Sequence, residues 1–536
     1  MKKRNAVFFY LMILSVSALT ILPIKNLVAQ NNLYWVYLEE KATDLTTWEN
    51  PFDYFSPRGV LRKAQQQVLF DKHDLPIRQE ILREIETLAR VKMQSKWLNA
   101  VLVETEHPDL LEHLDFVDRI EARIPMRKSF ASLADDDANF QYGSARLQTE
   151  QVFGDLLHAR GMTGSNVLIA VFDGGFHNTP NLSVFDDLFN EGRLKGTYSF
   201  VLQDSNVFTR GSHGTHVLSV MAAKTRGIFV GTAPDADYWL FMTEDQLVEV
   251  NAEEHNWLAA AEVSDSLGVD IINSSLGYTT FDPGQNDYTP ADLDGQTGIV
   301  TQAALFAARK GMLVVNSAGN AGASNWRKIV KPADADSIIA VGAVDIQGNR
   351  ANFSSEGPTI DGRIKPDVMA RGAGTYYIAT NGLPATGNGT SLSSPIIAGL
   401  AACLRQAYPH HSTENLRQTI IRSAHLYFNP DTLMGFGIPN FDVAFNNVFS
   451  VDEFASKQQI SVYPNPAENQ IQVSWSVDFE PLGMRVFSAS GRLVRELTIR
   501  NQQTSKELDI SDLSSGTYIL HIYGKSKAIS SIIIKQ

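Results

Sequence analysis

The middle of the chain alternates continuous apolar runs with segments of helical periodicity. The apolar runs are 167–172, 269–272, 312–315 and 338–341. The helical segments between them are 213–224, 253–267 and 300–310. Strands that are apolar on both sides and separated by helices are typical of a parallel sheet covered on both faces. We therefore predict an α/β domain with a three-layer parallel sheet over residues 140–447. Ligands of such sheets bind beyond the carboxyl ends of the strands.

The region before this domain has a mixed pattern. Residues 30–128 contain strand patterns at 34–38, 97–103 and 118–124, and a helical pattern at 77–89. This mixture predicts a small α+β domain. Polar and charged residues after position 126 indicate an exposed connection to the α/β domain.

The region after the α/β domain has the pattern of an all-β unit. Residues 458–536 contain short alternating segments, such as 471–477 and 518–523, with Ser-Gly turns nearby. Short alternating strands punctuated by turns predict a small all-β sandwich.

The first 29 residues have the pattern of a secretory signal peptide. A basic start, Lys2-Lys3-Arg4, is followed by an uncharged apolar run over 6–24, and Ala29 is a suitable last residue before cleavage. The run is also long enough for an uncleaved membrane anchor. The single cysteine, Cys403, excludes disulfides within the chain, and its apolar helical setting predicts an inert buried thiol.

Charge narrows the range of partners. The 536 residues include 46 Lys and Arg and 59 Asp and Glu, which gives a net charge of −13. This balance argues against a nucleic-acid partner, because binding to phosphates needs a basic surface. Residues 227–308 contain no Lys or Arg but 14 acidic residues, so this single block carries the excess of negative charge.

Three polar residues stand where α/β domains place their chemistry. Asp173 ends an apolar run, and His213 and Ser391 each begin a helical segment. Each has an ordinary explanation alone: a turn-forming Asp, a helix-start His or half of a His-x-x-His metal pair with His216, and a serine cap. Together they supply a nucleophile, a base for its proton and a carboxylate to orient the base.

The segments around these residues resemble the subtilisin-like serine proteases, or subtilases. The resemblance extends over about residues 140–445 and rests on Asp173-Gly-Gly, His213-Gly-Thr-His, Asn273-Ser-Ser-Leu-Gly277, Asn316-Ser-Ala-Gly-Asn320 and Gly389-Thr-Ser-Leu-Ser-Ser-Pro395. It implies an Asp173, His213, Ser391 triad and an oxyanion-hole amide on Asn320. It also implies that Ser275, Leu276 and Gly277 bind the substrate backbone. Two residues depart from the family pattern: Gly174 replaces the usual Ser or Thr, and Leu392 the usual Met.

Both flanking regions have resemblances of their own. Residues 30–128 resemble, weakly, a subtilase propeptide, which assists folding and inhibits the enzyme until it is cleaved off, here within 125–142. The tail resembles the C-terminal sorting domain of the type IX secretion system, on Tyr463-Pro-Asn-Pro466, Leu513-Ser-Ser-Gly516 and the closing Ile532-Ile-Ile-Lys-Gln536. These resemblances imply a protein secreted from, or held at the outer surface of, a Gram-negative bacterium of Bacteroidetes type.

These resemblances imply a secreted serine endopeptidase that is made as a zymogen and acts as a monomer on protein or peptide substrates. The alternative is an inactive or self-processing-only surface scaffold. The triad chemistry needs no cofactor. The oxygen-rich segments 282–287 and 292–295 fit either structural calcium or a solvated acidic loop. We place the acidic block on the surface beside the substrate groove, where it would bind basic peptides, hold cations or simply solubilise the protein.

Overall fold

The computed structural model describes residues 33–39, 50–123, 142–245, 250–282, 287–446, 460–476, 479–499, 503–525 and 527–536. The predicted signal peptide, 1–29, lies outside these residues, as does the predicted cleavage segment except for Tyr142. Within the described residues, no helix has both the length and the apolar character needed to cross a bilayer.

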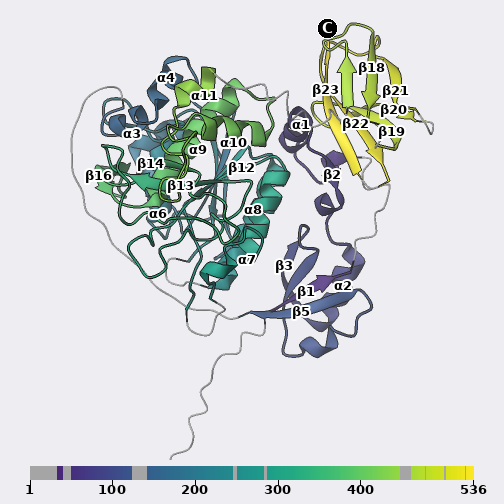
Figure 1. The fold of residues 1–536 in the computed structure, drawn as a ribbon. Helices are drawn as coiled ribbons and strands as arrows, with labels where there is room; N and C mark the ends of the chain where they lie inside the picture. The colour runs from purple at the N-terminus through teal and green to yellow at the C-terminus, as the bar shows by residue number, and fades with distance from the viewer. Residues whose placement is uncertain are drawn as a thin grey trace, which may run out of the picture.

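A seven-stranded parallel sheet forms the centre of the largest domain (Figure 1). Its order is β14-β13-β12-β11-β6-β10-β7, and every neighbouring pair is parallel. The strands are β6 (Leu168–Asp173), β7 (Leu194–Ser199), β10 (Asp237–Met242), β11 (Ile271–Ser274), β12 (Leu313–Ser317), β13 (Ile339–Val344) and β14 (Val368–Arg371). This arrangement confirms the predicted α/β class.

Helices cover both faces of this sheet, because its strands are apolar on both sides. On β6, Ile169 and Val171 pack toward α6 (His213–Ala222) and α9 (Thr390–Ala407). The alternate residues Leu168, Ala170 and Phe172 pack toward α7 (Asn251–Leu267) and α8 (Ile299–Arg309). Smaller elements complete the domain: α3 (Arg146–Glu150), α4 (Gly154–Ala159), α5 (Asp186–Asn190), α10 (Thr413–Arg422), α11 (Phe441–Asn446), and the hairpins β8 (Lys224–Thr225) with β9 (Phe229–Val230) and β15 (Thr375–Ile378) with β16 (Pro384–Gly387).

The N-terminal domain contains an antiparallel sheet of order β3-β4-β1-β5. Its strands are β1 (Leu33–Leu38), β3 (Arg90–Ser95), β4 (Ala100–Glu104) and β5 (Val117–Arg123), and α2 (Gln79–Leu88) packs on it. The α+β class is therefore confirmed. The predicted strand at 97–103 starts too early, since Trp97 lies in the turn between β3 and β4 and packs onto α8 instead, with its ring 5.7 Å from that of Phe306.

The C-terminal domain consists of antiparallel strands in two sheets, as predicted. One sheet contains β17 (Ile460–Tyr463), β18 (Gln470–Trp475) and β21 (Ser505–Asp509). The other contains β19 (Pro481–Ser488), β20 (Leu493–Thr498), β22 (Gly516–Gly524) and β23 (Lys527–Lys535). Their apolar faces share one core, which includes Val473 and Leu520.

One segment of the N-terminal domain leaves its own sheet. Residues 50–75, which we call the strap, contain α1 (Pro57–Gln66) and β2 (Phe70–Asp71). In Figure 1 they lie between the central domain and the C-terminal strands. β2 pairs with β23, so the second C-terminal sheet has the order β2-β23-β22-β19-β20. The sequence pattern did not predict this connection.

Candidate active site

The predicted acid and base are in direct contact. Asp173 is the last residue of β6 and is fully buried, and His213 is the first residue of α6. The Nδ1 atom of His213 lies 2.9 Å from Oδ1 and 3.0 Å from Oδ2 of Asp173. The backbone N–H of Gly174 donates a further hydrogen bond of 2.8 Å to Oδ1. The carboxylate thus fixes the orientation of the ring and leaves Nε2 as the nitrogen that can accept a proton.

Glycines allow this contact by bringing two loops together. A Cβ atom on Gly175, whose φ is +122°, would lie 2.3 Å from the carbonyl oxygen of Arg210. A Cβ on Gly214 would lie 2.5 Å from the carbonyl oxygen of Gly175. Neither position accepts a side chain without moving the backbone, so the loop after β6 and the start of α6 depend on glycine.

The protonation of the two histidines of α6 differs because their neighbours differ. Burial lowers the pKa of His213, but the charge of Asp173 and the hydrogen bond to it outweigh burial and raise that pKa above its usual value. Burial, with a smaller effect from His213, lowers the pKa of His216 to about 4. The ring of His216 lies against Tyr377, with centroids 4.3 Å apart. The two imidazoles therefore have separate partners.

Ser391 and Asn320 meet beside Gly389. Ser391 is the second residue of α9, a position whose backbone N–H has no acceptor within the helix. A Cβ atom on Gly389 would lie 2.9 Å from Oγ of Ser391 and 3.6 Å from Nδ2 of Asn320. Any side chain at position 389 would therefore stand between the hydroxyl and the amide.

The amide of Asn320 is held in one orientation by Thr390. Its Oδ1 atom accepts hydrogen bonds from the backbone N–H of Thr390 at 2.8 Å and from the Thr390 hydroxyl at 3.1 Å. Because both donors fix the oxygen, the NH₂ group points away from them, on the side of Gly389. Sequence reasoning did not assign this role to Thr390, although it adjoins Ser391.

Pro395 explains how Ser391 is attached to the sheet. A proline lacks the N–H that would bond to the carbonyl four residues earlier, which here is that of Ser391. That carbonyl instead accepts a hydrogen bond of 2.9 Å from the hydroxyl of Ser275. Asn273 extends the link, because its amide donates to Ser275 at 3.2 Å and its oxygen accepts from Ser394 at 3.0 Å.

These contacts place the candidate residues at the ends of three adjacent strands. Asp173 ends β6, Ser275 follows β11, and Asn320 follows β12. β11 pairs with both β6 and β12. Asp173, Ser275 and Asn320 therefore lie at the same carboxyl edge of the sheet, where neighbouring strands are about 4.8 Å apart, and Ser275 ties Ser391 to that edge.

The predicted substrate segment, Ser275 to Gly277, follows β11. The side chain of Ser275 is buried against α9, as described above, whereas Gly277 is exposed. The carbonyl of Leu276 accepts hydrogen bonds from the Asn316 amide and the Ser317 hydroxyl. A Cβ atom on Gly277 would lie 2.1 Å from the Val330 side chain, so the chain passes close to Val330 there.

The acidic loops do not form a cation cage with their described residues. The carboxylates of Asp292 and Asp294 accept hydrogen bonds from donors of their own turns, on Thr289 and on Thr297. Asp287 accepts the backbone N–H of Phe281. Within the described part of the chain, no group of three or more His, Cys, Asp or Glu residues is arranged to hold a metal ion.

The acids of α7 are buried in the full chain, so the prediction that the acidic block 227–308 lies on the surface is wrong for this helix. Glu253 caps its own helix through the Val250 N–H, and burial raises the pKa of Glu254 to about 7.

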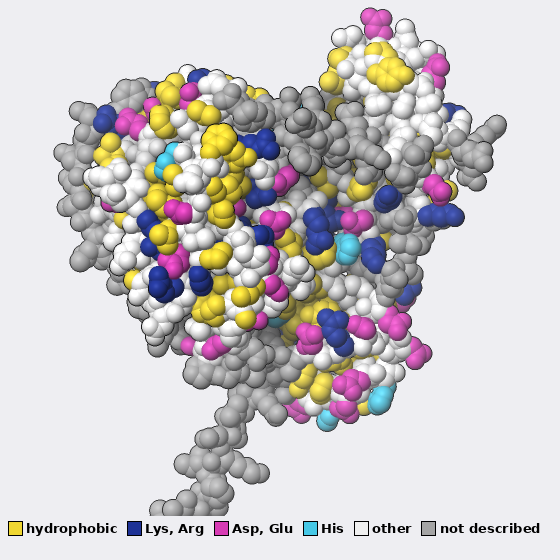
Figure 2. Space-filling model, viewed as in Figure 1, with side chains coloured by type: hydrophobic (Ala, Val, Ile, Leu, Met, Phe, Trp, Pro, Cys, Tyr) yellow, Lys and Arg dark blue, Asp and Glu magenta, His cyan; other side chains and the backbone are white. Residues whose placement is uncertain are grey.

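The other two acids of α7 have partners in the N-terminal domain. Glu262 accepts hydrogen bonds from the backbone N–H groups of Lys96 and Trp97. Asp265 pairs with Arg62 and Lys63 of the strap. Figure 2 shows basic and acidic side chains gathered where the two domains meet.

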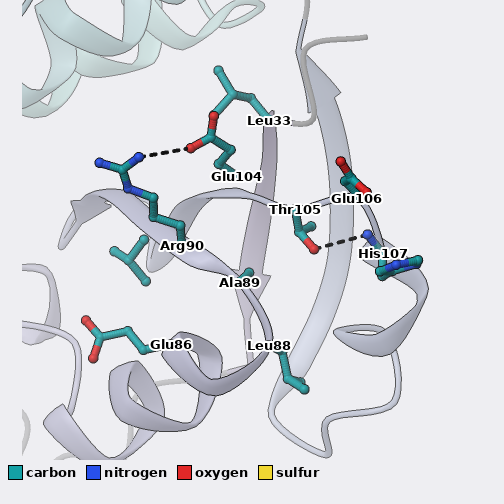
Figure 3. A pocket seen from close by; sticks show the side chains of 10 residues that line it. Leu33, Glu86, Leu88, Ala89, Arg90, Glu104, Thr105, Glu106 and His107 are labelled. Carbon is teal, nitrogen blue, oxygen red and sulfur yellow. Dashed lines mark hydrogen bonds and ion pairs between the residues drawn. The ribbon is translucent and has the colours of Figure 1, made fainter.

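One hollow on the described residues lies away from this site. It has a volume of about 860 Å³ and is lined by residues of the N-terminal domain, including Glu86, Thr105 and His107 (Figure 3). An ion pair between Arg90 and Glu104, 3.6 Å apart, crosses it. A second crevice, of about 430 Å³, lies where the N-terminal domain meets the central one. Met93 and Leu102 line one side of it, and the start of α7 lines the other.

The fold and this arrangement of residues define a parallel α/β domain with a hydrogen-bonded Asp–His pair at the carboxyl edge of its sheet and a helix-start serine tied to the same edge. Comparison with known proteins then specifies the family. The model of the subtilase family matches residues 164–437, about half of the chain. The chain belongs to the subtilase family.

Individual relatives agree with this assignment. Subtilisin E of Bacillus subtilis (strain 168) is 30% identical over 361 residues, covering 66% of this chain and 83% of the relative. Subtilisin of Bacillus pumilus is 32% identical over 299 residues, covering 55% and 96%. Alkaline elastase YaB of Bacillus sp. (strain YaB) is 29% identical over 349 residues, covering 63% and 82%.

The flanking domains also match family models. Residues 33–137 match the peptidase S8 propeptide domain of Bacteroidota, and residues 461–536 match the secretion system C-terminal sorting domain. The protein is thus a serine-type endopeptidase of the subtilisin-like kind, made with a propeptide and a sorting tail. Both added domains mark it as a secreted or cell-surface protein.

Proposed function

We propose that this protein cleaves peptide bonds with Asp173, His213 and Ser391 as its triad. The hydrogen bond between Asp173 and His213 carries the proposal, because it leaves the second ring nitrogen as a base of raised pKa. His213 takes the proton of the Ser391 hydroxyl as the oxygen attacks the substrate carbonyl. The Asn320 amide and the Ser391 N–H stabilise the oxyanion. Protonated His213 then gives its proton to the leaving amine, and water releases the acyl group.

In this proposal the substrate backbone pairs with the chain at Leu276 and Gly277, while Ser275 holds Ser391 in place. Gly277 is exposed, as a backbone site for an extended peptide requires. Substrates are proteins or peptides, and no metal or cofactor takes part in the chemical steps. We expect the enzyme to act as a monomer.

Removing the nucleophile tests the proposal. Ser391→Ala should lower the turnover of a peptide substrate about 10⁶-fold, and Asn320→Ala about 10²–10³-fold, because it removes a single donor to the oxyanion. A fluorophosphonate probe should label the mature wild type and leave Ser391→Ala unlabelled. If the mature wild type stays unlabelled, the protein is instead a scaffold that lacks peptidase activity.

We further propose that the protein is made as a zymogen with domains at 30–128, 140–447 and 458–536. A signal peptide is removed after Ala29, the propeptide is cut within 125–142, and a type IX secretion system exports the chain across the outer membrane of a Bacteroidetes-type bacterium. If the enzyme cuts its own propeptide, Ser391→Ala should accumulate as the uncut precursor. Mass spectrometry of the secreted protein would identify its N-terminal and C-terminal residues and hence the cleavage sites.

Structural calcium, which is common in the family, stays a prediction. The carboxylates of Asp287, Asp292 and Asp294 accept hydrogen bonds from nearby backbone N–H groups, so an ion bound to these three residues would compete with those donors. If calcium stabilises the protein, a chelator that removes the ion should lower the midpoint of thermal unfolding. An unchanged midpoint would exclude calcium as a stabilising ligand.

A further inference from the structure

The strap, residues 50–75, contacts two domains that lie far apart in the sequence. It branches from the propeptide between β1 and α2, and the propeptide sheet itself contains no part of it. One side of α1 faces the catalytic domain, and β2 extends the sheet of the sorting domain (Figure 1). Each contact has its own chemistry.

The contact with the catalytic domain is a buried cluster of charges. Asp265 of α7 is fully buried and pairs with Arg62 at 2.5 Å and Lys63 at 3.1 Å. Asp74 of the strap pairs with Lys310 of the catalytic domain at 2.8 Å. Each domain therefore supplies an acid to the other's base, and Asp265, Arg62 and Lys310 would lose these acid–base partners on separation.

The contact with the sorting domain is a strand pairing backed by aromatic rings. β2 runs antiparallel to β23, with Phe70 opposite Ala528 and Asp71 opposite Lys527. The ring of Phe70 lies edge-on to His521, with centroids 5.5 Å apart. The ring of Phe52 lies 5.3 Å from that of Phe487. Without the strap, β23 would be the edge of its sheet at this end, and Phe487 would lose its cover.

We propose that the strap is a clasp that holds the sorting domain to the zymogen and covers the edge of β23 until the propeptide is removed. Removal takes β2 and the aromatic cover away together. The edge of β23 is then open at residues 527–528, and an unpaired strand edge accepts an extended peptide strand. The consequence for processing rests on the proposed zymogen function, whereas the clasp itself requires no catalysis.

A cross-link in the Ser391→Ala precursor tests the clasp without any proteolysis. Asp71→Cys with Lys527→Cys places two thiols on paired residues, and the native Cys403 is fully buried. A short bis-maleimide should join them within the chain and change its mobility on a denaturing gel. The control, Asp71→Cys with Glu496→Cys, places the second thiol on β20, four strands or about 19 Å away, and should not react in this way. Equal cross-linking of the two pairs, or none in the first, would overturn the clasp.

Hydrogen exchange tests whether the strap protects β23. In the Ser391→Ala precursor, Phe70→Ser should speed amide exchange at residues 527–529 at least tenfold and leave β6 and β12 unchanged. The control, Phe116→Ser, removes the same kind of side chain from the propeptide's own core and should not speed exchange at residues 527–529. Equal effects of the two substitutions would contradict the proposal.

The wild type separates the clasp from its consequence. Processed protein should show the same fast exchange at residues 527–529 as the Phe70→Ser precursor. Slow exchange after the propeptide has gone would overturn the uncovering of β23. If the wild type is never processed, the zymogen function fails, while the two precursor experiments still decide the clasp.

Discussion

The catalytic edge and the propeptide-binding face of one domain satisfy their buried acids in opposite ways. Asp173 takes its partners, His213 and the N–H of Gly174, from within the domain. Glu262 and Asp265 take theirs from the propeptide, at Trp97 and Arg62 among others. In this zymogen, buried acids of the catalytic edge have partners within their own domain, and buried acids of the propeptide-binding face have partners in the removable segment.

The largest effect is expected on the permanent pair. Asp173→Asn should lower turnover about 10⁴-fold, because it removes the charge that orients His213 and stabilises its protonated form. The base must be neutral, so wild-type activity falls as pH drops through the raised pKa of His213. Without the charge, burial dominates, and the acid limb should move below pH 6.5. A pH–rate profile of both proteins measures the shift, and an unmoved limb would contradict the assignment.

The separable pair should affect inhibition and leave catalysis unchanged. Asp265→Ala leaves the buried charge of Arg62 without its acid and removes one of the two acidic partners of Lys63, at a cost of about 3–5 kcal/mol to the bound state. The cleaved propeptide should then inhibit on the order of 10²–10⁴-fold more weakly. Asp237→Ala is the control, since its partner Lys195 belongs to the catalytic domain. If both substitutions weaken inhibition equally, the contrast between partners inside the domain and partners in the propeptide is wrong.

The same face should respond to acid. Burial raises the pKa of Asp265, but the charges of Lys63 and Arg62 outweigh it and lower that pKa to about 2. The pairing therefore stabilises the complex above the ordinary carboxylate pKa and is lost as pH falls toward 2.

The smallest effect is expected at the link between the sheet and the nucleophile helix. Ser275→Ala removes one hydrogen bond to the Ser391 carbonyl, worth about 0.5–1.5 kcal/mol, and should lower turnover roughly 2–10-fold. KM for a short peptide should change little, because the hydroxyl faces Ser391. Ser275→Thr keeps a hydroxyl and should restore turnover. A raised KM with unchanged turnover would instead indicate contact with substrate.

Several elements could be predicted from the sequence because one physical cause decided them. β6, β12 and β13 are buried on both faces, so their apolar runs are continuous. β7, β10 and β14 were missed: β7 is an edge strand with Lys195 and Thr197 among its six residues, β10 begins with Asp237 and is largely aromatic, and β14 is an edge strand of four residues.

The candidate site divides in the same way. Asp173, His213, Ser391 and Asn320 lie in short local motifs, and the first two are in contact as expected. The hydrogen bond of Ser275 to Ser391 depends on Pro395, and the burial of Asp265 depends on the strap. Both arise from segments far apart in the chain, which no local pattern contains.

The position of β23 in the sequence has a consequence for the order of synthesis. Phe70 pairs with Ala528, more than four hundred residues later, so the clasp closes only after the ribosome has made nearly all of the described chain. Until then Phe70 and its neighbours lack their cover, whereas Arg62 can already meet Asp265. A truncated or misfolded sorting domain would leave that apolar surface open.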